Sequence, residues 1–138
     1  MPESFEHHFL VQQSLQYIQE HSLVKEPRLI KLDSFHLSER DSPPMIEGYR
    51  PDLFYEEVLG GMCLIGEAKT GKDLDRPHTK AQICAFLGYC KRKNSSLFLL
   101  AVPWDYERRA KNLAKHLQTE CGADNVKILV LRKLKVRI

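Results

Sequence analysis

Residues 49–69, YRPDLFYEEVLGGMCLIGEAK, form the most informative segment of the chain. The segment holds two apolar, strand-like runs, 49–55 and 62–69, and Gly60-Gly61 between them supplies a turn. Asp52 lies in the first run, and Glu67 lies at the far end of the second. The segment therefore predicts a β-hairpin with acidic side chains at the end away from its turn.

The charged residues of this hairpin are expected to meet. If the strands pair symmetrically about the Leu59–Gly60 bond, Asp52 lies directly opposite Glu67. Side chains alternate along a strand, so Glu67 and Lys69 point to one face and Ala68 to the other. Two like charges in opposed positions repel each other, so they either splay into solvent or hold a cation between them. The plainer alternative is an edge-strand Asp52 beside an exposed ion pair of Glu67 and Lys69.

A hard divalent ion such as Mg²⁺ suits this arrangement, because it takes carboxylate, carbonyl and water oxygens. The expected ligands are Asp52, Glu67 and the main-chain carbonyl of Ala68, which leave positions for a phosphate oxygen and a water. Such an ion would activate that water and neutralise charge in the transition state of phosphodiester hydrolysis. Lys69 would orient the water or the scissile phosphate.

The rest of the chain predicts an α/β fold. Helices are expected at 4–21, with Ser4 as N-cap, at 77–91 with Pro77 in the first turn, and at 104–120. Further strands are expected at 28–35, 96–103 and 126–131, the last extending towards residue 138, and residues 36–48 form a loop. The order αβββαβαβ predicts a central mixed sheet with helices on both faces and parallel final strands.

Composition fits one folded domain over residues 1–138. Hydrophobic residues make up 43% and charged residues 28%, the balance of an ordinary globular protein. No apolar run is long enough to span a bilayer, and the acidic start does not suit a signal peptide, so a cytoplasmic protein is expected. The net charge of +3 permits a polyanionic partner. The four cysteines are scattered and predict mostly buried free thiols rather than a disulfide framework.

Pro51-Asp52 followed by Glu67-Ala68-Lys69, in this order of elements, resembles the PD-(D/E)xK nuclease superfamily, whose members have the restriction-endonuclease-like fold. The resemblance covers essentially the whole chain. It implies an endonuclease that hydrolyses phosphodiester bonds in DNA with Mg²⁺, for which Mn²⁺ can substitute. It further implies that Asp52 and Glu67 bind the metal and that Lys69 is the catalytic lysine.

Two more features match subgroups of that superfamily. An acidic residue in the first helix completes the metal site in some members, and Glu6 is the candidate here, although a carboxylate in a first turn is also favoured by the helix dipole. Gln82 matches a glutamine on the helix after the lysine. Helical geometry places it on one stripe with His78, Ala85 and Tyr89, which either faces the metal site and substrate or is a solvated helix face.

Basic residues near the active-site loop are the best candidates for substrate contact, namely Lys72, Arg76 and Lys80. Three other basic clusters, at 91–93, 108–115 and 132–137, each have an ordinary explanation as a helix end, a solvated face or a protected edge strand. The pair His7-His8 and His21 have no third ligand at fitting spacing, so a zinc site is not expected.

Two alternatives stay open at the level of sequence. The chain could be a catalytically silent nucleic-acid-binding or assembly module on the same fold, since fold alone does not give function. It could also be a phosphodiesterase that acts on RNA. For the nuclease, the sequence does not distinguish duplex, branched or single-stranded substrates, the number of metal ions, or a homodimer from a chain targeted by a partner protein.

Overall fold

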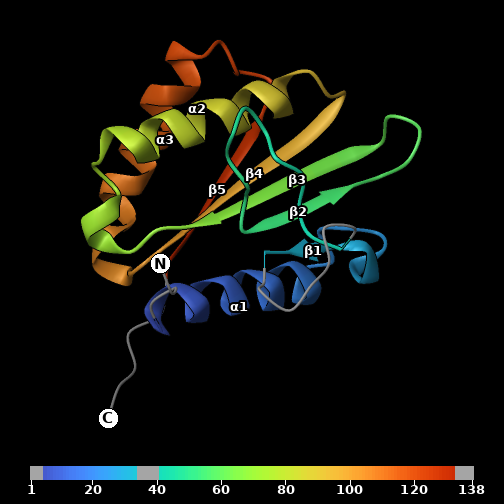
Figure 1. Ribbon diagram of the computed structural model, residues 1–138, viewed down its shortest axis with the longest axis horizontal. Helices are drawn as coiled ribbons and strands as arrows, with labels where there is room; N and C mark the ends of the chain where they lie inside the picture. The colour runs from blue at the N-terminus through green and yellow to red at the C-terminus, as the bar shows by residue number, and fades with distance from the viewer. Residues whose placement is uncertain (1–4, 34–40, 133–138) are drawn as a thin grey trace.

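The computed structural model of the protein describes residues 5–33 and 41–132. Its helices are α1 (Phe5–Glu20), α2 (Pro77–Lys91) and α3 (Glu107–Glu120), with short 3₁₀ helices η1 (Pro27–Leu29), η2 (Gly71–Asp73) and η3 (Trp104–Tyr106). Its strands are β1 (Lys31–Leu32), β2 (Leu53–Glu56), β3 (Met62–Ala68), β4 (Ser95–Val102) and β5 (Lys127–Arg132). The predicted order of one helix, three strands, helix, strand, helix and strand is confirmed (Figure 1).

The five strands form one mixed sheet in the order β1-β2-β3-β4-β5. The pairs β1–β2 and β2–β3 are antiparallel, whereas β3–β4 and β4–β5 are parallel. A parallel pair needs a long crossover, and here α2 and α3 provide the two crossovers. The predicted mixed sheet with parallel final strands is therefore confirmed.

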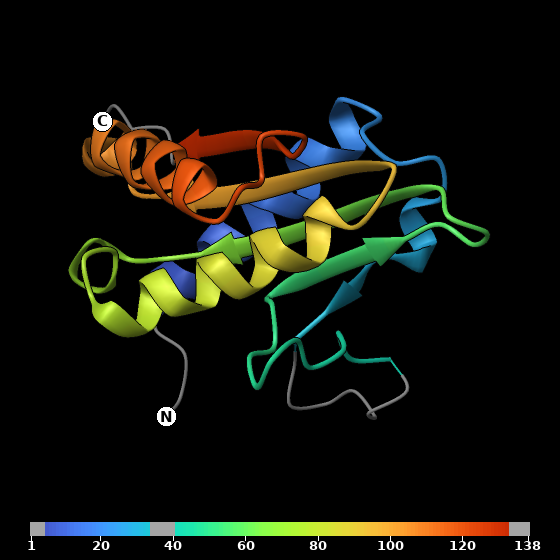
Figure 2. The ribbon, with the colours of Figure 1, turned by 90° about the horizontal axis from the view of Figure 1, so that it is seen from above.

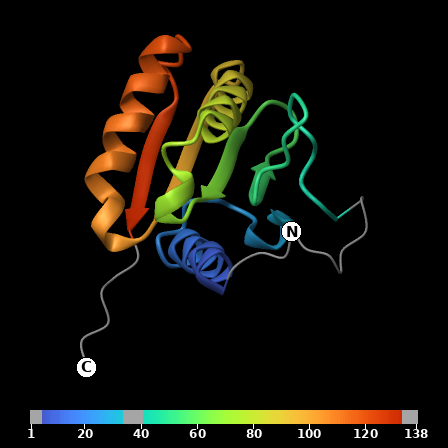
Figure 3. The same cartoon turned by 60° about the vertical axis from the view of Figure 1, so that its left-hand side comes forward.

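Helices cover both faces of the sheet, as predicted. The alternation of β3 divides the core: Cys63 and Ile65 pack in one cluster with α2 and α3, whereas Leu64 and Ala68 pack in the other with α1. Figures 1 and 2 show α1 on one side of the sheet and α2 with α3 on the other. In Figure 3, α3 (orange) runs alongside β5 (red), the last strand of the sheet.

The hairpin has the register that symmetric pairing about the Leu59–Gly60 bond predicts. Its partners run from Leu53↔Gly66 to Glu56↔Cys63. Leu59 and Gly60 both have positive φ, 64° and 78°, as in the tight turns whose twist matches that of paired strands. The register brings the start of β2 beside the end of β3, where the candidate site lies.

Two predicted strands are shorter than expected. Within residues 28–33, the strand predicted at 28–35 covers only Lys31–Leu32, because Pro27 begins a 3₁₀ turn that occupies residues 27–29. The strand predicted at 49–55 begins only at Leu53. Tyr49 is engaged in a local bridge with Ile46, and Pro51 has no N–H to give to a ladder. Residues 34–40, which cover the end of the first predicted strand and part of the predicted loop, lie outside the described residues.

The helices follow the prediction more closely. Pro77–Lys91 is found with the predicted bounds, and α1 covers 5–20 of the predicted 4–21. The helix predicted from 104 begins instead at Glu107, after the 3₁₀ turn η3. The proposed N-cap Ser4 and the extension of the last strand beyond Arg132 lie outside the described residues. Within residues 5–33 and 41–132, no helix has the length and apolar character needed to cross a membrane.

Candidate active site

Three acidic residues lie in one row across the neighbouring ends of β1, β2 and β3. The main-chain N–H of Asp33 donates to the main-chain oxygen of Asp52 at 3.0 Å, which continues the β1–β2 register by one residue. The β2–β3 register, continued by one residue, puts Asp52 opposite Glu67. Only 8% of Asp52 and 4% of Glu67 is exposed. The two carboxylates are therefore not splayed into solvent, which excludes the plainer alternative for this pair.

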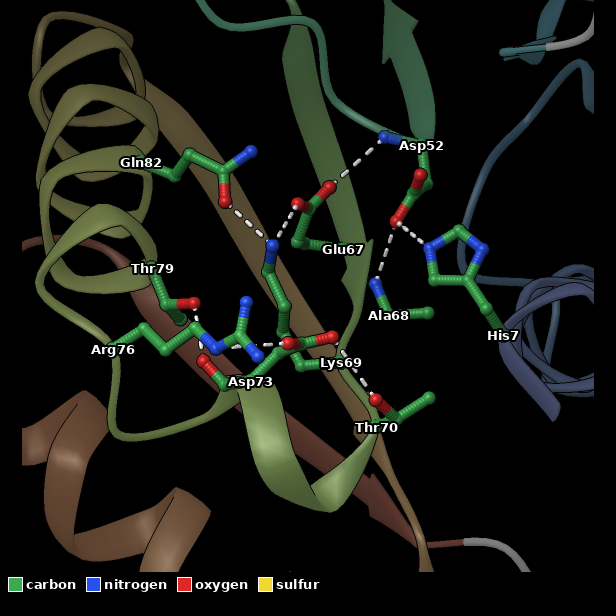
Figure 4. Close-up of polar contacts among 10 residues, drawn as sticks. All are labelled: His7, Asp52, Glu67, Ala68, Lys69, Thr70, Asp73, Arg76, Thr79 and Gln82. Carbon is green, nitrogen blue, oxygen red and sulfur yellow. Dashed lines mark hydrogen bonds and ion pairs between the residues drawn. The ribbon is translucent and has the colours of Figure 1, made fainter. Parts of the chain in front are cut away.

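Each of these carboxylates is held by the backbone of the opposite strand (Figure 4). The N–H of Asp52 donates to Oε1 of Glu67 at 3.1 Å, and the N–H of Ala68 donates to Oδ2 of Asp52 at 2.8 Å. Because the N–H and the C=O of one strand residue point to the same side, the carbonyl of Ala68 is also directed towards Asp52. The predicted ligand set thus converges at the point where β2 begins and β3 ends.

The electrostatics of the row favour the binding of positive charge. Burial raises the pKa of the Glu67 carboxyl well above its usual range, and the negative charge of Asp52 raises it further, while the Lys69 ammonium opposes the shift. Burial also raises the pKa of Asp33, again with a contribution from the charge of Asp52. A positive charge placed at the row would therefore stabilise the ionised form of Glu67.

Lys69 and Gln82 meet beside Glu67, so Gln82 faces the candidate site and does not lie on a solvated face of α2. The ammonium of Lys69 donates to Oε1 of Gln82 at 2.5 Å and lies 3.4 Å from Oε2 of Glu67. The side chains of Lys69 and Glu67 are 14% and 3% exposed, so the ion pair is largely removed from water. Gln82 itself is buried on α2. In Figure 4 the Lys69 side chain extends between α2 and β3, with its ammonium directed at both partners.

His7 is a site residue whose role the sequence reasoning missed. Its Nε2 lies 3.1 Å from Oδ2 of Asp52, so α1 contributes a side chain to the acidic row (Figure 4). A signal for it existed in the sequence. His7 precedes the buried residues of α1 by three, four, seven and eleven positions, which is the spacing of one helix face: Leu10, Val11, Ser14 and Ile18.

Glu6, the residue predicted to complete the metal site, is half-buried one position before His7. Adjacent residues lie about 100° apart around a helix, so the face that brings His7 to Asp52 is not the face of Glu6. Its role as a ligand stays a prediction, and the contact that the structure provides from α1 comes from His7.

Four of the five predicted substrate-binding residues lie close together in the chain, and Tyr89 lies apart from them. Lys72, Arg76, His78 and Lys80 are exposed on η2 and the first turns of α2, next to the strand end that carries Lys69. Arg76 lies 3.2 Å from Asp73, and the His78 ring makes an edge contact with Tyr49. These side chains, called the rim below, lie on or directly after the loop that also carries Asp73 and Asp75.

Asp73 organises the loop that carries this rim. Its carboxylate accepts a hydrogen bond from Thr70 at 3.0 Å, and its main-chain oxygen accepts one from the hydroxyl of Thr79 (Figure 4). The loop after Lys69 is thereby tied to the first turn of α2. The exposed side chains of Lys72 and Arg76 extend from this fixed loop.

Tyr89 takes part in a separate network. Its hydroxyl donates to Glu56 at 2.9 Å, its ring packs edge-on against Phe54, and the Lys93 ammonium lies over the ring. Glu56 is the last residue of β2, whereas Asp52 lies just before the first residue of that strand. The two carboxylates are therefore at opposite ends of β2. Tyr89 also lies two helical turns beyond Gln82, so the structure does not bring it together with Asp52 and Glu67. Its predicted contact with substrate remains a prediction.

Comparison with models of known families, with curated proteins and with solved structures gives no match. The chemistry of the site therefore has to be argued from its own residues. Within the described part of the chain, no three His, Cys, Asp or Glu side chains already form a closed group around a metal position. The donors around Asp52 are nonetheless of a fitting kind: two carboxylates, one main-chain carbonyl and one imidazole.

These donors suit a divalent cation for a specific physical reason. A buried pair of carboxylates needs compensating charge, and burial of Glu67 is costly when it is ionised without a partner. Carboxylate and carbonyl oxygens are preferred by Mg²⁺ and Mn²⁺, and an imidazole nitrogen shifts the preference towards transition metals. The arrangement can thus hold a cation at the acidic row with a lysine ammonium beside it.

Proposed function

We propose that the protein is a metal-dependent endonuclease that hydrolyses phosphodiester bonds in DNA, with the restriction-endonuclease-like form of the α/β fold and the active site of the PD-(D/E)xK superfamily. One observation carries the proposal. Asp52 and Glu67 are buried opposite each other, each held by the other strand's backbone, with the Lys69 ammonium 3.4 Å from Glu67. A structural role alone gives no reason to bury two facing carboxylates.

The residues that would hold the cation are Asp52, Glu67, the carbonyl of Ala68 and His7. When bound, Mg²⁺ or Mn²⁺ supplies Lewis-acid activation of a water and neutralises charge that develops on the phosphate. Nε2 of His7 lies at the same carboxylate oxygen that accepts the Ala68 N–H, so it orients Asp52 in the metal-free protein. To bind the cation, this nitrogen would exchange its hydrogen bond with Asp52 for the metal. The imidazole makes Mn²⁺ a better activator for this chain than the oxygen ligands alone imply.

Lys69 is the chain's own charged donor at the reacting phosphate. Its ammonium carries three protons, of which one is directed to Gln82 and another towards Glu67. The remaining donor is available to the attacking water or the scissile phosphate. Gln82 acts as a positioning residue, because its buried amide fixes the end of a side chain that is otherwise flexible.

The rim residues account for nucleic-acid binding. Lys72, Arg76 and Lys80 are exposed beside the site, and cationic side chains of this kind contact phosphates without reading sequence. The net charge of +3 supports binding to a polyanion, whether DNA or RNA. The rim gives no basis for base-specific recognition, so selectivity by DNA structure or by a partner protein fits better than a restriction-type sequence specificity.

The test is cleavage of plasmid, branched and single-stranded DNA, and of RNA, by purified protein with Mg²⁺, Mn²⁺ or EDTA. Lys69→Ala is the key variant, and Lys115→Ala, which removes an exposed lysine of α3, is the matched control. We expect cleavage that requires the metal, falls by roughly 100-fold or more in Lys69→Ala, and is unchanged in Lys115→Ala.

Each other outcome points to a defined alternative. Cleavage of RNA alone would replace the DNA substrate by RNA. Wild-type protein and Lys69→Ala that bind nucleic acid equally and cut nothing would identify a silent binding module. Cutting that persists unchanged in Lys69→Ala would come from a contaminating nuclease, and the assigned catalytic centre would then be refuted.

A further inference from the structure

Two cysteines from different helices meet on the side of α2 that faces α3. Cys84 lies in the middle of α2, and Cys121 caps the end of α3, 37 residues later. Their sulfur atoms are 2.7 Å apart, which is within 1 Å of the S–S bond length of about 2.05 Å. Both residues are half-buried, so the pair lies near the surface and not in the core.

The surrounding contacts hold the two thiols in place. Lys91 lies seven residues after Cys84, on the same face of α2, and its ammonium donates to the main-chain oxygen of Cys121 at 2.9 Å. Asn125 donates in return to the main-chain oxygen of Lys91 at 3.0 Å. The end of α3 is thus fixed against α2, so the sulfur atoms stay close without a covalent link.

The chain contains an internal comparison for this pair. Cys63 on β3 and Cys90 on α2 also interact with each other, since hydrogen bonding to Cys90 is the largest cause of the raised pKa of the Cys63 thiol. Both are fully buried in the core, whereas Cys84 and Cys121 are partly exposed. The two pairs therefore differ in access from solvent.

We propose that Cys84 and Cys121 form a reversible disulfide site, oxidised by low-molecular-weight disulfides such as oxidised glutathione. One thiolate attacks a sulfur of the small disulfide and releases one glutathione thiol. The second thiolate then attacks the mixed disulfide and releases the other. Two protein S–H bonds are lost, one S–S bond forms, and the oxidised glutathione is reduced to two molecules of glutathione.

The bridge would reinforce the helical layer without disturbing the acidic row. Gln82 and Cys84 are two positions apart on α2 and therefore face different directions, so a link at Cys84 leaves the contact of Gln82 with Lys69 in place. Closing a loop of this length restricts the unfolded chain. Burial raises the pKa of the Cys84 thiol to about 12, so Cys84 rests as a thiol and exchanges slowly with small disulfides.

The experiment is incubation of the purified protein with oxidised glutathione, followed by denaturation, thiol counting, intact mass and peptide mapping. We expect two of the four thiols to disappear, a mass lower by two hydrogens, a Cys84–Cys121 peptide link, and a Tm higher by about 10 °C that dithiothreitol reverses. Cys84→Ser and Cys121→Ser should each lose the link and the Tm increase. Cys63→Ala should keep both.

A wild-type protein that retains four free thiols, or that links Cys63 with Cys90 or two chains together, would overturn the proposal. Circular dichroism of the reduced variants establishes that each is folded, and Cys84→Ala replaces Cys84→Ser if the serine variant is not. The readouts do not involve cleavage of DNA. Failure of this proposal is therefore separate from failure of the proposed nuclease activity.

Discussion

His7 on α1 contacts Asp52, 45 residues away in the chain. Its Nε2 lies at Oδ2 of Asp52, which also accepts the hydrogen bond from the Ala68 N–H. At the scale of the single residue, we expect His7→Ala to lower metal-dependent cleavage by about 10- to 100-fold, the cost typical of removing a ligand or a group that orients one. The loss should be larger with Mn²⁺ than with Mg²⁺, because the variant leaves only oxygen donors. Single-turnover rates measured across a titration of each metal would check this.

His8 is the control for that variant, since it is adjacent to His7 and exposed. His8→Ala should retain wild-type rates and wild-type apparent metal affinity. Equal rates for His7→Ala and wild-type protein at every metal concentration would show that His7 neither binds the cation nor orients Asp52.

The residues of the acidic centre differ in how readily the sequence reveals them. Asp52, Glu67 and Lys69 belong to one hairpin, so a turn and the alternation of a strand are enough to align them. Asp33 and His7 reach the same place through tertiary structure. The spacing of α1 places His7 on the buried face of the helix, but the docking of α1 on the sheet and the pairing of a two-residue strand depend on the whole core.

At the scale of the element, the loop after β3 is held in place by close packing against η3. A Cβ atom added at Gly71 would overlap the ring of Tyr106, so only glycine fits this contact. We expect Gly71→Ala to lower the free energy of unfolding by about 1–3 kcal/mol, because the ring or the loop must move. Cleavage should fall as well, since the loop joins Lys69 to the first turn of α2. Urea unfolding and rate measurements on the variant would check both effects.

Gly88 on α2 provides the matched control. A Cβ atom there meets nothing within 4 Å, and glycine lowers the stability of a helix interior. Gly88→Ala should therefore raise the free energy of unfolding by up to about 1 kcal/mol and leave cleavage unchanged. If Gly71→Ala were as stable and as active as Gly88→Ala, close packing of the loop against η3 would contribute neither to stability nor to cleavage.

The elements themselves were predictable in proportion to their local signals. The sequence predicts α2 with its observed bounds, because Pro77 marks its first turn and apolar residues recur along it. It predicts the start of α3 three residues early, since a 3₁₀ turn at Trp104–Tyr106 fits the same composition. Within residues 28–33, β1 is shorter than predicted, because a run of strand-like residues does not reveal how many of them find a partner.

At the scale of the whole molecule, the sheet order follows from the chain order, with each strand beside its neighbour in sequence. In this topology the start of β2, the end of β3 and the first turns of α1 and α2 lie at the same end of the sheet (Figure 1). The two halves of the core are built separately, with α1 on one face and α2 and α3 on the other. Helices from both faces of the sheet contribute side chains to the site. The energetic cost of burying its carboxylates therefore lowers the stability of the whole fold.

That cost predicts how global stability depends on pH and metal. Because the pKa of Glu67 is raised in the folded protein, the folded state keeps a proton that the unfolded chain releases above its usual value of 4.5. The metal-free protein should therefore lose stability as pH rises from that value towards the folded pKa.

Glu67→Gln mimics the protonated form, so its stability should match wild type at low pH and exceed it by about 1–3 kcal/mol at about pH 8 in EDTA. A fixed Mn²⁺ concentration, 100 times the dissociation constant at about pH 8, should stabilise wild-type protein by about 2.7 kcal/mol at that pH and by less at lower pH, and should stabilise Glu67→Gln far less. Thermal unfolding of both proteins across pH, with EDTA or Mn²⁺, measures all of these terms. A metal-free wild type that gains stability relative to Glu67→Gln with rising pH would mean that Glu67 is ionised without a cation, and the physical reason for a metal at this site would be lost.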